Sequence, residues 1–278
     1  RPSFGRVADA PGVGDLFLHQ LSTLGPMARS PEDMALLLDV ISGPDPRAPL
    51  SITSEPVGEL HSADLSTARI GWLGDWGGAF PMEEGILALG EAALQVLTEL
   101  GAEVHTVSPP FSADAMWEAW VTLRNFSVAA KLGPLLDDGA PLKETAVWEI
   151  EEGRKLSAME VHAASVVRSD WFRAAADLFE TFDALILPSA QIWPFDVTID
   201  YPREIGGQAM DTYHRWMQVV IPISLLGLPS VALPAGFGGN GLPMGIQLWG
   251  ARGSDARLLG MAAAYHARTR WPEERPAM

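Results

Sequence analysis

The stretch Arg69-Ile70-Gly71-Trp72-Leu73 decides the fold class of this chain of 278 residues. It is a short and mostly apolar run, which is typical of a β-strand. A helix is predicted from about Glu83 to Leu100, where Gly101 supplies a stop, and a second strand is predicted at 103–107. Strand, helix and strand in this order predict a βαβ unit with two parallel strands.

Two further apolar runs extend the predicted sheet. Ala184-Leu185-Ile186-Leu187 ends at Pro188, and Ser230-Val231-Ala232-Leu233 ends at Pro234. Continuous apolar runs of this length are typical of strands that are buried on both faces. A Gly-rich turn then precedes Met244-Gly245-Ile246-Gln247-Leu248, which is predicted to form a hairpin with the strand before it. The sheet should therefore contain both parallel and antiparallel pairs.

Helical patterns occupy most of the remaining sequence. Ser30 is a favoured N-cap residue and is followed by Pro31, which suits the first helical position. The region 112–182 is helical, with an interruption expected at Pro134, and Ser157-Ala158-Met159-Glu160 predicts a capping box. A last helix should begin near Ser254. The predicted fold class is α/β, with a mixed β-sheet sandwiched between helical layers.

Composition excludes several classes of function. The formal net charge is −16 and the isoelectric point is near 4.7, which argues against partners that are polyanions, whether nucleic acid or an anionic membrane surface. The chain has no cysteine, so disulfides and thiolate metal sites are excluded. It has no apolar run long enough to span a bilayer and no signal-peptide pattern at its start. A cytoplasmic protein is expected.

The usual catalytic patterns are absent from the sequence. It contains no G-x-S-x-G motif, no P-loop and no G-x-G-x-x-G after a strand. None of the six histidines is spaced for a metal pair, so the histidines predict no metal site. His214 lies near Tyr213 and Trp216 and is a candidate pocket residue. The acidic cluster Glu149, Glu151 and Glu152 predicts a solvated helix face.

Three segments nevertheless resemble one enzyme family, the amidase-signature hydrolases. Arg1-Pro2-Ser3-Phe4-Gly5-Arg6-Val7 resembles the end of the signature, which has the form G-L-(K/R)-P-(S/T)-x-G-R. The segment 21–33 contains Gly25-Pro26-Met27-Ala28-Arg29, which is similar to the family's GPMAR segment. The segments 227–236 and 241–250 resemble its G-x-P-x-x-x-x-P-x-G and G-L-P-x-G-x-Q-L-x-G blocks. The order and spacing match along the whole chain.

This resemblance implies a specific chemistry. The family hydrolyses carboxamides with a Ser–cis-Ser–Lys triad, in which the lysine polarises the second serine and that serine takes the proton of the nucleophile. No cofactor is needed, and the substrate is a small-molecule amide. All three residues precede the segment that matches Arg1. No Gly-Gly-Ser occurs here, and Lys131, Lys143 and Lys155 lie in the helical middle. No catalytic residue is therefore assigned, and the chain by itself is predicted to be inactive.

The resemblance also implies that residues 1–278 are the C-terminal part of a single amidase domain, incomplete at its N-terminal side. The first residue is not methionine, which agrees with this expectation. Loss of the upstream half should expose sheet edges and apolar surface. Self-association or association with the missing N-terminal half is expected.

The C-terminal half should supply walls of the substrate pocket. Ser22 and Thr23 precede Gly25-Pro26 in the second matching segment, and Trp117 and Trp120 lie on a helix that varies within the family. Gln191, Ile192 and Trp193 follow the strand that ends at Pro188, the position where α/β sheets place ligands. For each tryptophan the competing interpretation is packing in the core.

Three functions remain open from the sequence. The first is a free-standing amidase. The second is the amidase-like subunit of a glutamine-dependent tRNA amidotransferase, but Ser22-Thr23 stands where that subunit carries Asp-Gln, which favours the free-standing enzyme. The third is a non-catalytic binding domain on the same scaffold.

Overall fold

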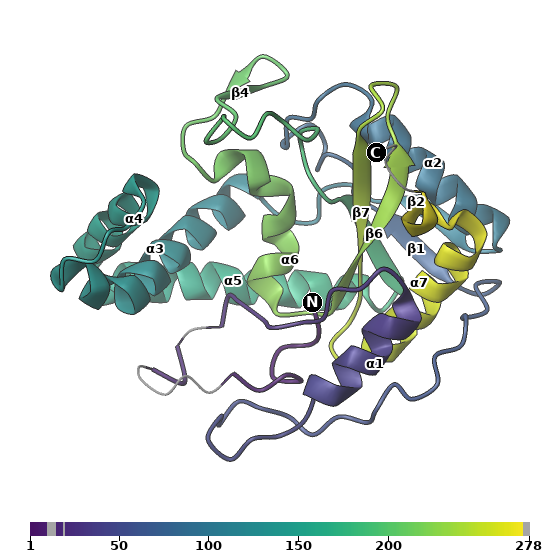
Figure 1. Cartoon of the computed structure of the whole chain (residues 1–278), viewed down its shortest axis with the longest axis horizontal. Helices are drawn as coiled ribbons and strands as arrows, with labels where there is room; N and C mark the ends of the chain where they lie inside the picture. Colours follow the sequence, from purple (N-terminus) through teal and green to yellow (C-terminus); the bar gives the residue numbers. More distant parts are fainter. Residues whose placement is uncertain (10–14, 19, 275–278) are drawn as a thin grey trace.

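A five-stranded mixed sheet organises the protein, as described by a computed structural model of residues 1–9, 15–18 and 20–274 (Figure 1). The strand order is β2-β1-β3-β7-β6. Strand β1 pairs in parallel with β2 and β3, whereas β7 pairs antiparallel with β3 and β6. The prediction of a mixed sheet is therefore confirmed. The strands are β1 (Arg69–Trp72), β2 (Glu103–Thr106), β3 (Ala184–Pro188), β6 (Ser230–Phe237) and β7 (Pro243–Trp249).

The predicted βαβ unit is present, with α2 (Ile86–Glu99) as its crossover helix. Gly71 at the centre of β1 shows why this strand needs a glycine. A Cβ atom there would lie 2.5 Å from the Leu185 side chain of the neighbouring strand β3. The missing side chain therefore lets β1 and β3 pack without a clash.

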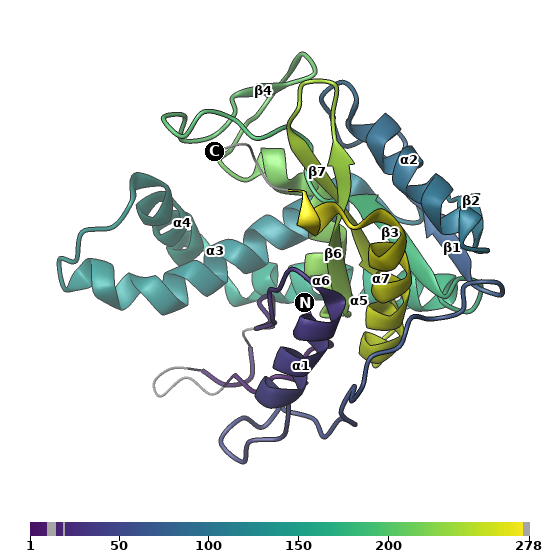
Figure 2. The ribbon, with the colours of Figure 1, turned by 45° about the vertical axis from the view of Figure 1, so that its right-hand side comes forward.

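Helices cover both faces of the sheet (Figures 1 and 2). One face packs against α1 (Pro31–Ile41), α2 and α7 (Asp255–Thr269), and the other against α3 (Ala113–Asp137), α5 (Ala158–Leu178) and α6 (Ile221–Leu226). Successive residues of β3 alternate between these two cores, so that Ile186 packs with the first and Leu187 with the second. The sheet thus lies between helical layers, as predicted.

Local capping signals are confirmed. The Ser30 side chain accepts a hydrogen bond from the Asp33 N–H, and Ser157 and Glu160 form the predicted capping box. The expected interruption at Pro134 is wrong, because α3 continues through it to Asp137. Pro134 lies one turn from the helix end, where loss of one N–H disrupts little of the hydrogen-bond ladder.

Several short elements were not predicted. After β3, the chain forms a two-stranded hairpin of β4 (Glu204–Ile205) and β5 (Gln208–Ala209), then the 3-10 helix η1 (Arg215–Val220). The remaining elements are α4 (Glu144–Lys155) and η2 (Trp271–Glu273). Within the described ranges, no helix is both long and apolar enough to cross a membrane.

Candidate functional site

A hollow of about 450 Å³ opens at the carboxyl end of β3. Its walls come from the segment that follows β3, from the facing strands β6 and β7, and from η1. The carboxyl ends of strands are where α/β sheets bind ligands. We call it the β3 hollow, and its main wall residues are Ile192, Trp193, Phe195, Trp216, Pro234 and Met244.

Trp193 is held in this wall by backbone and carboxylate groups at the start of α2. Its backbone N–H donates to Glu83 Oε2 at 2.7 Å, and its indole N–H donates to the Glu84 carbonyl at 3.1 Å. Gly238 lies against the ring, since a Cβ atom there would be 2.4 Å from it. These contacts fix the Trp193 side chain, which is also a lining residue of the hollow.

Gln191 lies beneath the wall and is fully buried. Its side-chain NH₂ donates to the Pro81 carbonyl at 3.0 Å, and its side-chain oxygen accepts from the Val219 N–H at 3.0 Å. Both ends of the amide are thus satisfied by the protein. Gln191 ties the segment after β3 to η1, which positions Ile192 and Trp193.

Trp117 and Trp120 lie on α3 and are not among the wall residues of the β3 hollow. Their rings stack with centroids 6.0 Å apart. The Arg215 guanidinium lies 3.8 Å from the centroid of the Trp117 ring, and Trp120 meets the ring of His214 edge-on at 5.2 Å. Their present contacts are those of packed side chains.

Ser22 and Thr23 line a different and smaller hollow of about 50 Å³, together with Phe4, Leu50 and Lys131. The Thr23 hydroxyl is shielded from solvent and has no hydrogen-bond partner among the described residues. The seven predicted wall residues therefore fall into three places. Only Ile192 and Trp193 line the β3 hollow.

Sequence patterns did not predict the other wall residues of the β3 hollow, for different reasons. Phe195 follows Ile192 in the same segment and could have been included by position alone. Pro234 and Met244 reach the hollow because β7 pairs with both β3 and β6, a register that no single segment encodes. The clustering of Trp216 with Tyr213 and His214 was the available signal for Trp216.

A buried carboxylate of α4, Glu149, contacts a histidine that precedes η1 and an arginine of α3. His214 Nε2 is 2.9 Å from Glu149 Oε1, and Arg124 Nε donates to the same oxygen at 2.7 Å. The rings of Trp120, Trp148 and Tyr213 contact the imidazole. We call this set of six residues the His214 cluster.

The prediction that Glu149 lies on a solvated face is wrong, because this residue is only 3% exposed. The physical reason is the close approach of two helices. A Cβ atom at Gly153 would lie 2.2 Å from the Asn125 carbonyl oxygen, so only glycine lets α4 lie this near α3. Burial raises the pKa of Glu149, but the hydrogen bonds and charges of His214 and Arg124 outweigh burial and leave that pKa below its ordinary value.

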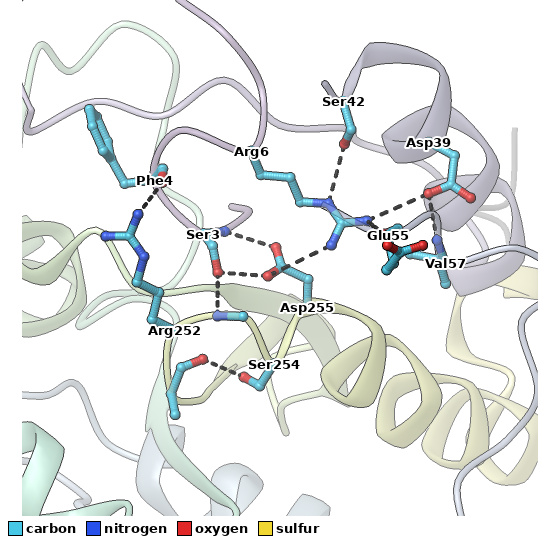
Figure 3. A network of polar contacts seen from close by, with 12 residues as sticks. Ser3, Phe4, Arg6, Asp39, Ser42, Glu55, Val57, Arg252, Ser254 and Asp255 are labelled. Atoms are coloured by element: carbon cyan, nitrogen blue, oxygen red, sulfur yellow. Dashed lines mark hydrogen bonds and ion pairs between the residues drawn. The ribbon is translucent and has the colours of Figure 1, made fainter. Parts of the chain in front are cut away.

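A second buried network fastens the first residues of the chain to α7 (Figure 3). The backbone N–H and the hydroxyl of Ser3 donate to the two oxygens of Asp255, at 2.8 and 2.6 Å, and the Gly253 N–H donates to the Ser3 hydroxyl at 2.9 Å. Arg6 forms ion pairs with Asp255 at 4.0 Å and with Asp39 at 3.6 Å. The Ser3 hydroxyl is therefore buried, and it both donates and accepts a hydrogen bond within the protein.

The groups needed to activate a serine are not assembled in the part of the chain that the structure describes. Lys131, Lys143 and Lys155 are all exposed, and Lys155 pairs with Glu152. The described residues contain no group of three or more His, Asp or Glu side chains placed to hold a metal ion.

Similarity to known proteins agrees with this geometry. The family model described as Amidase matches residues 1–259. The chain is 27% identical to an acylamidase of Rhodococcus erythropolis, covering 91% of this chain and 54% of that protein. It is 31% identical to one subunit of the glutamyl-tRNA(Gln) amidotransferase of Thermus thermophilus, covering 97% of this chain and 59% of that protein.

The fold is also similar to solved structures. A bacterial aryl acylamidase of the amidase-signature enzymes superposes with a TM-score of 0.85 at 26% identity, over 99% of this chain and 60% of that one. A 6-aminohexanoate cyclic dimer hydrolase superposes with a TM-score of 0.82 at 21% identity, over 99% of this chain and 61% of that one. The chain thus spans between one half and two thirds of the length of these relatives.

Proposed function

The chain belongs to the amidase family, and we propose on this basis that it is part of a hydrolase that cleaves carboxamides to a carboxylate and an amine or ammonia. Residues 1–278 are the C-terminal part of a single amidase domain in this proposal. They supply half of the core and walls of the substrate pocket. The nucleophilic serine, its partner serine and the lysine belong to polypeptide outside these residues.

The β3 hollow is the observation that carries this proposal. It is a concave, largely apolar site at the carboxyl end of a strand, in a chain whose family model matches residues 1–259. No lysine lies buried against serines among the described residues. A pocket wall without an activated hydroxyl fits a contribution to binding and not to the chemical step.

The predicted wall residues take different roles in this proposal. Ile192 and Trp193 contact the substrate, while Gln191 holds them in place. Ser22 and Thr23 border the substrate on a second segment. Trp117 and Trp120 support the pocket through η1, because Trp117 packs on Arg215 at the start of that element.

The test compares two proteins on one aryl amide, 4-nitroacetanilide. The 278-residue chain alone should give no turnover above buffer, whereas the complete reading frame that encodes it should release 4-nitroaniline. Turnover by the isolated chain would refute the assignment of catalytic residues to other polypeptide. A complete protein that hydrolyses no carboxamide would favour a non-catalytic binding domain on this scaffold.

A second candidate is an amidase-like subunit of a tRNA amidotransferase. It is favoured by the 31% identity to one subunit of the glutamyl-tRNA(Gln) amidotransferase of Thermus thermophilus. Ser22-Thr23, at the position of the amidotransferase Asp-Gln, favours the free-standing enzyme. Affinity purification of the complete protein from its own cells decides between them, since a stoichiometric second subunit would establish the amidotransferase.

The location and association of the protein are also proposed. We expect a cytoplasmic enzyme, given its acidic composition and its absence of cysteine. Strand β6 lies at an edge of the five-stranded sheet, and Leu36, Leu37 and Val40 on α1 are exposed. Exposed sheet edges and apolar helix faces favour association. Light scattering should show that the isolated chain is larger than a monomer.

A further inference from the structure

The β3 hollow has an unusually uniform lining. None of its lining residues carries a charge, and Ser189 is the one residue with a side-chain hydroxyl among them. Its floor is formed by small groups of β6 and β7, including Ala232 and Gly245. A ligand group seated there would find almost only apolar surface. Charged groups would lose their hydration without gaining a partner.

The aromatic side chains give this lining a shape. Phe195 meets Trp216 edge-on, with ring centroids 5.5 Å apart and planes at 89°. Trp193 is fixed in its wall by its hydrogen bonds to Glu83 and Glu84. Rings that are held in this way offer flat faces and edges, against which an aromatic group packs at low cost in conformational entropy.

The rim of the hollow carries negative charge. Ile192, Trp193 and Phe195 also line an adjoining hollow whose other residues include Glu83 and Glu84. Glu83 accepts a hydrogen bond from the Trp193 backbone, and Glu84 is exposed. Two carboxylates in the adjoining hollow, in a chain with a net charge of −16, repel an approaching carboxylate.

We infer that the β3 hollow selects an uncharged aromatic group on the substrate amide, and that glutamine is rejected. The inference rests on the proposed function for the role of the hollow, but its selectivity follows from the lining and the rim. The carboxylate of glutamine would meet a lining without any cationic side chain, next to the carboxylates of Glu83 and Glu84. A phenyl ring brings only apolar area to be buried.

The binding arm of the test uses the 278-residue chain and isothermal titration calorimetry with phenylacetamide. We expect saturable binding of phenylacetamide and at least about tenfold weaker binding of glutamine, a difference of about 1.4 kcal/mol. Absence of phenylacetamide binding, or equal binding of glutamine, would overturn the inference.

Two variants test whether binding occurs in this hollow. Ala232 is exposed on β6 and lines the hollow, so Ala232→Phe fills the space without disturbing the core. Trp216→Ala removes part of the wall. Both should weaken phenylacetamide binding about tenfold or more. Trp148→Ala is the matched control, because Trp148 is partly exposed and is not among the lining residues of the β3 hollow. Unchanged binding in Ala232→Phe would place the ligand elsewhere and refute the inference.

The hydrolysis arm separates this inference from the proposed function. The complete protein should hydrolyse phenylacetamide with a higher kcat/KM than glutamine. If it hydrolyses glutamine in preference, the inference fails and carboxamide hydrolysis stands. If it hydrolyses neither amide while the chain still binds phenylacetamide at the hollow, the proposed function fails and the selectivity of the hollow stands.

Discussion

The β3 hollow and the His214 cluster are both built from aromatic side chains, but the hollow is open and the cluster is closed. Trp193 and Trp216 border an open space, whereas Trp120 and Trp148 close around an imidazole. The difference lies in where the polar partners are. Trp193 donates hydrogen bonds to Glu83 and Glu84, which are not lining residues of the β3 hollow, and its side chain still lines that hollow. In the His214 cluster, His214 and Glu149 are at the centre and the rings cover them.

Tryptophan content does not, therefore, locate a binding site by itself. Rings that surround a buried hydrogen-bonded pair shield it from water and strengthen it, so these rings serve the structure. Rings whose hydrogen bonds lie on the far side of the wall remain available to a ligand. Stability should therefore depend most on the cluster, and ligand binding most on the hollow.

The greatest loss of stability is expected in the cluster. Glu149→Ala should lower the free energy of unfolding by about 3 kcal/mol, because it leaves His214 buried without its partner. Urea unfolding followed by circular dichroism measures this loss. Glu151→Ala is the matched control, since Glu151 is exposed on the same helix. Equal losses in the two variants would show that the buried pair contributes no more than a surface carboxylate.

A smaller loss of stability is expected in the wall of the hollow. Trp193→Ala should lower the free energy of unfolding by about 2 kcal/mol. This loss is smaller than for a tryptophan enclosed on all sides, because the space that the ring leaves opens into the β3 hollow and water can enter it. Trp193→Phe should recover most of that stability and lack only the hydrogen bond to Glu84. The midpoint of urea unfolding of the three proteins tests this ranking. If Trp193→Ala lost more stability than Glu149→Ala, the β3 hollow and not the His214 cluster would contribute more to stability.

The pH dependence of the unfolding free energy should further distinguish the His214 cluster from the β3 hollow. The pKa of Glu149 lies below its ordinary value of 4.5 in the folded protein, so its ionised form stabilises the fold. That contribution is complete above about pH 4.5 and is lost as the pH falls toward the folded pKa. The unfolding free energy of the wild type should therefore fall more steeply below pH 4.5 than that of Glu149→Gln. Parallel curves for the two proteins would show that Glu149 titrates alike in both states.

The least change in stability is expected at the mouth of the hollow. Phe195 is partly exposed, and Phe195→Ala should alter the unfolding free energy by about 0.5 kcal/mol or less. It should nevertheless weaken phenylacetamide binding in calorimetry, because it removes the edge-on partner of Trp216. Loss of stability without loss of binding would assign Phe195 to the core.

How much of this structure the sequence predicts depends on how far apart in the sequence the interacting residues are. Ser30 and Ser157 were interpretable locally, because helix caps involve neighbouring residues. Ile192 and Trp193 could be placed because they directly follow a recognisable strand. Glu149 could not, since its burial depends on a glycine contact between two helices and on His214, which is 65 residues away.

The link between Ser3 and Asp255 has a consequence for the order in which the protein is assembled. The two residues are 252 positions apart, and α7 begins with no side-chain cap of its own. Ser3 therefore has to remain without this partner while the residues between it and Asp255 are being synthesised. Contacts that close such a long loop form late, because its entropy has to be lost before the contact forms. The contact between Ser3 and α7 should therefore form after the sheet that lies between them in the sequence exists.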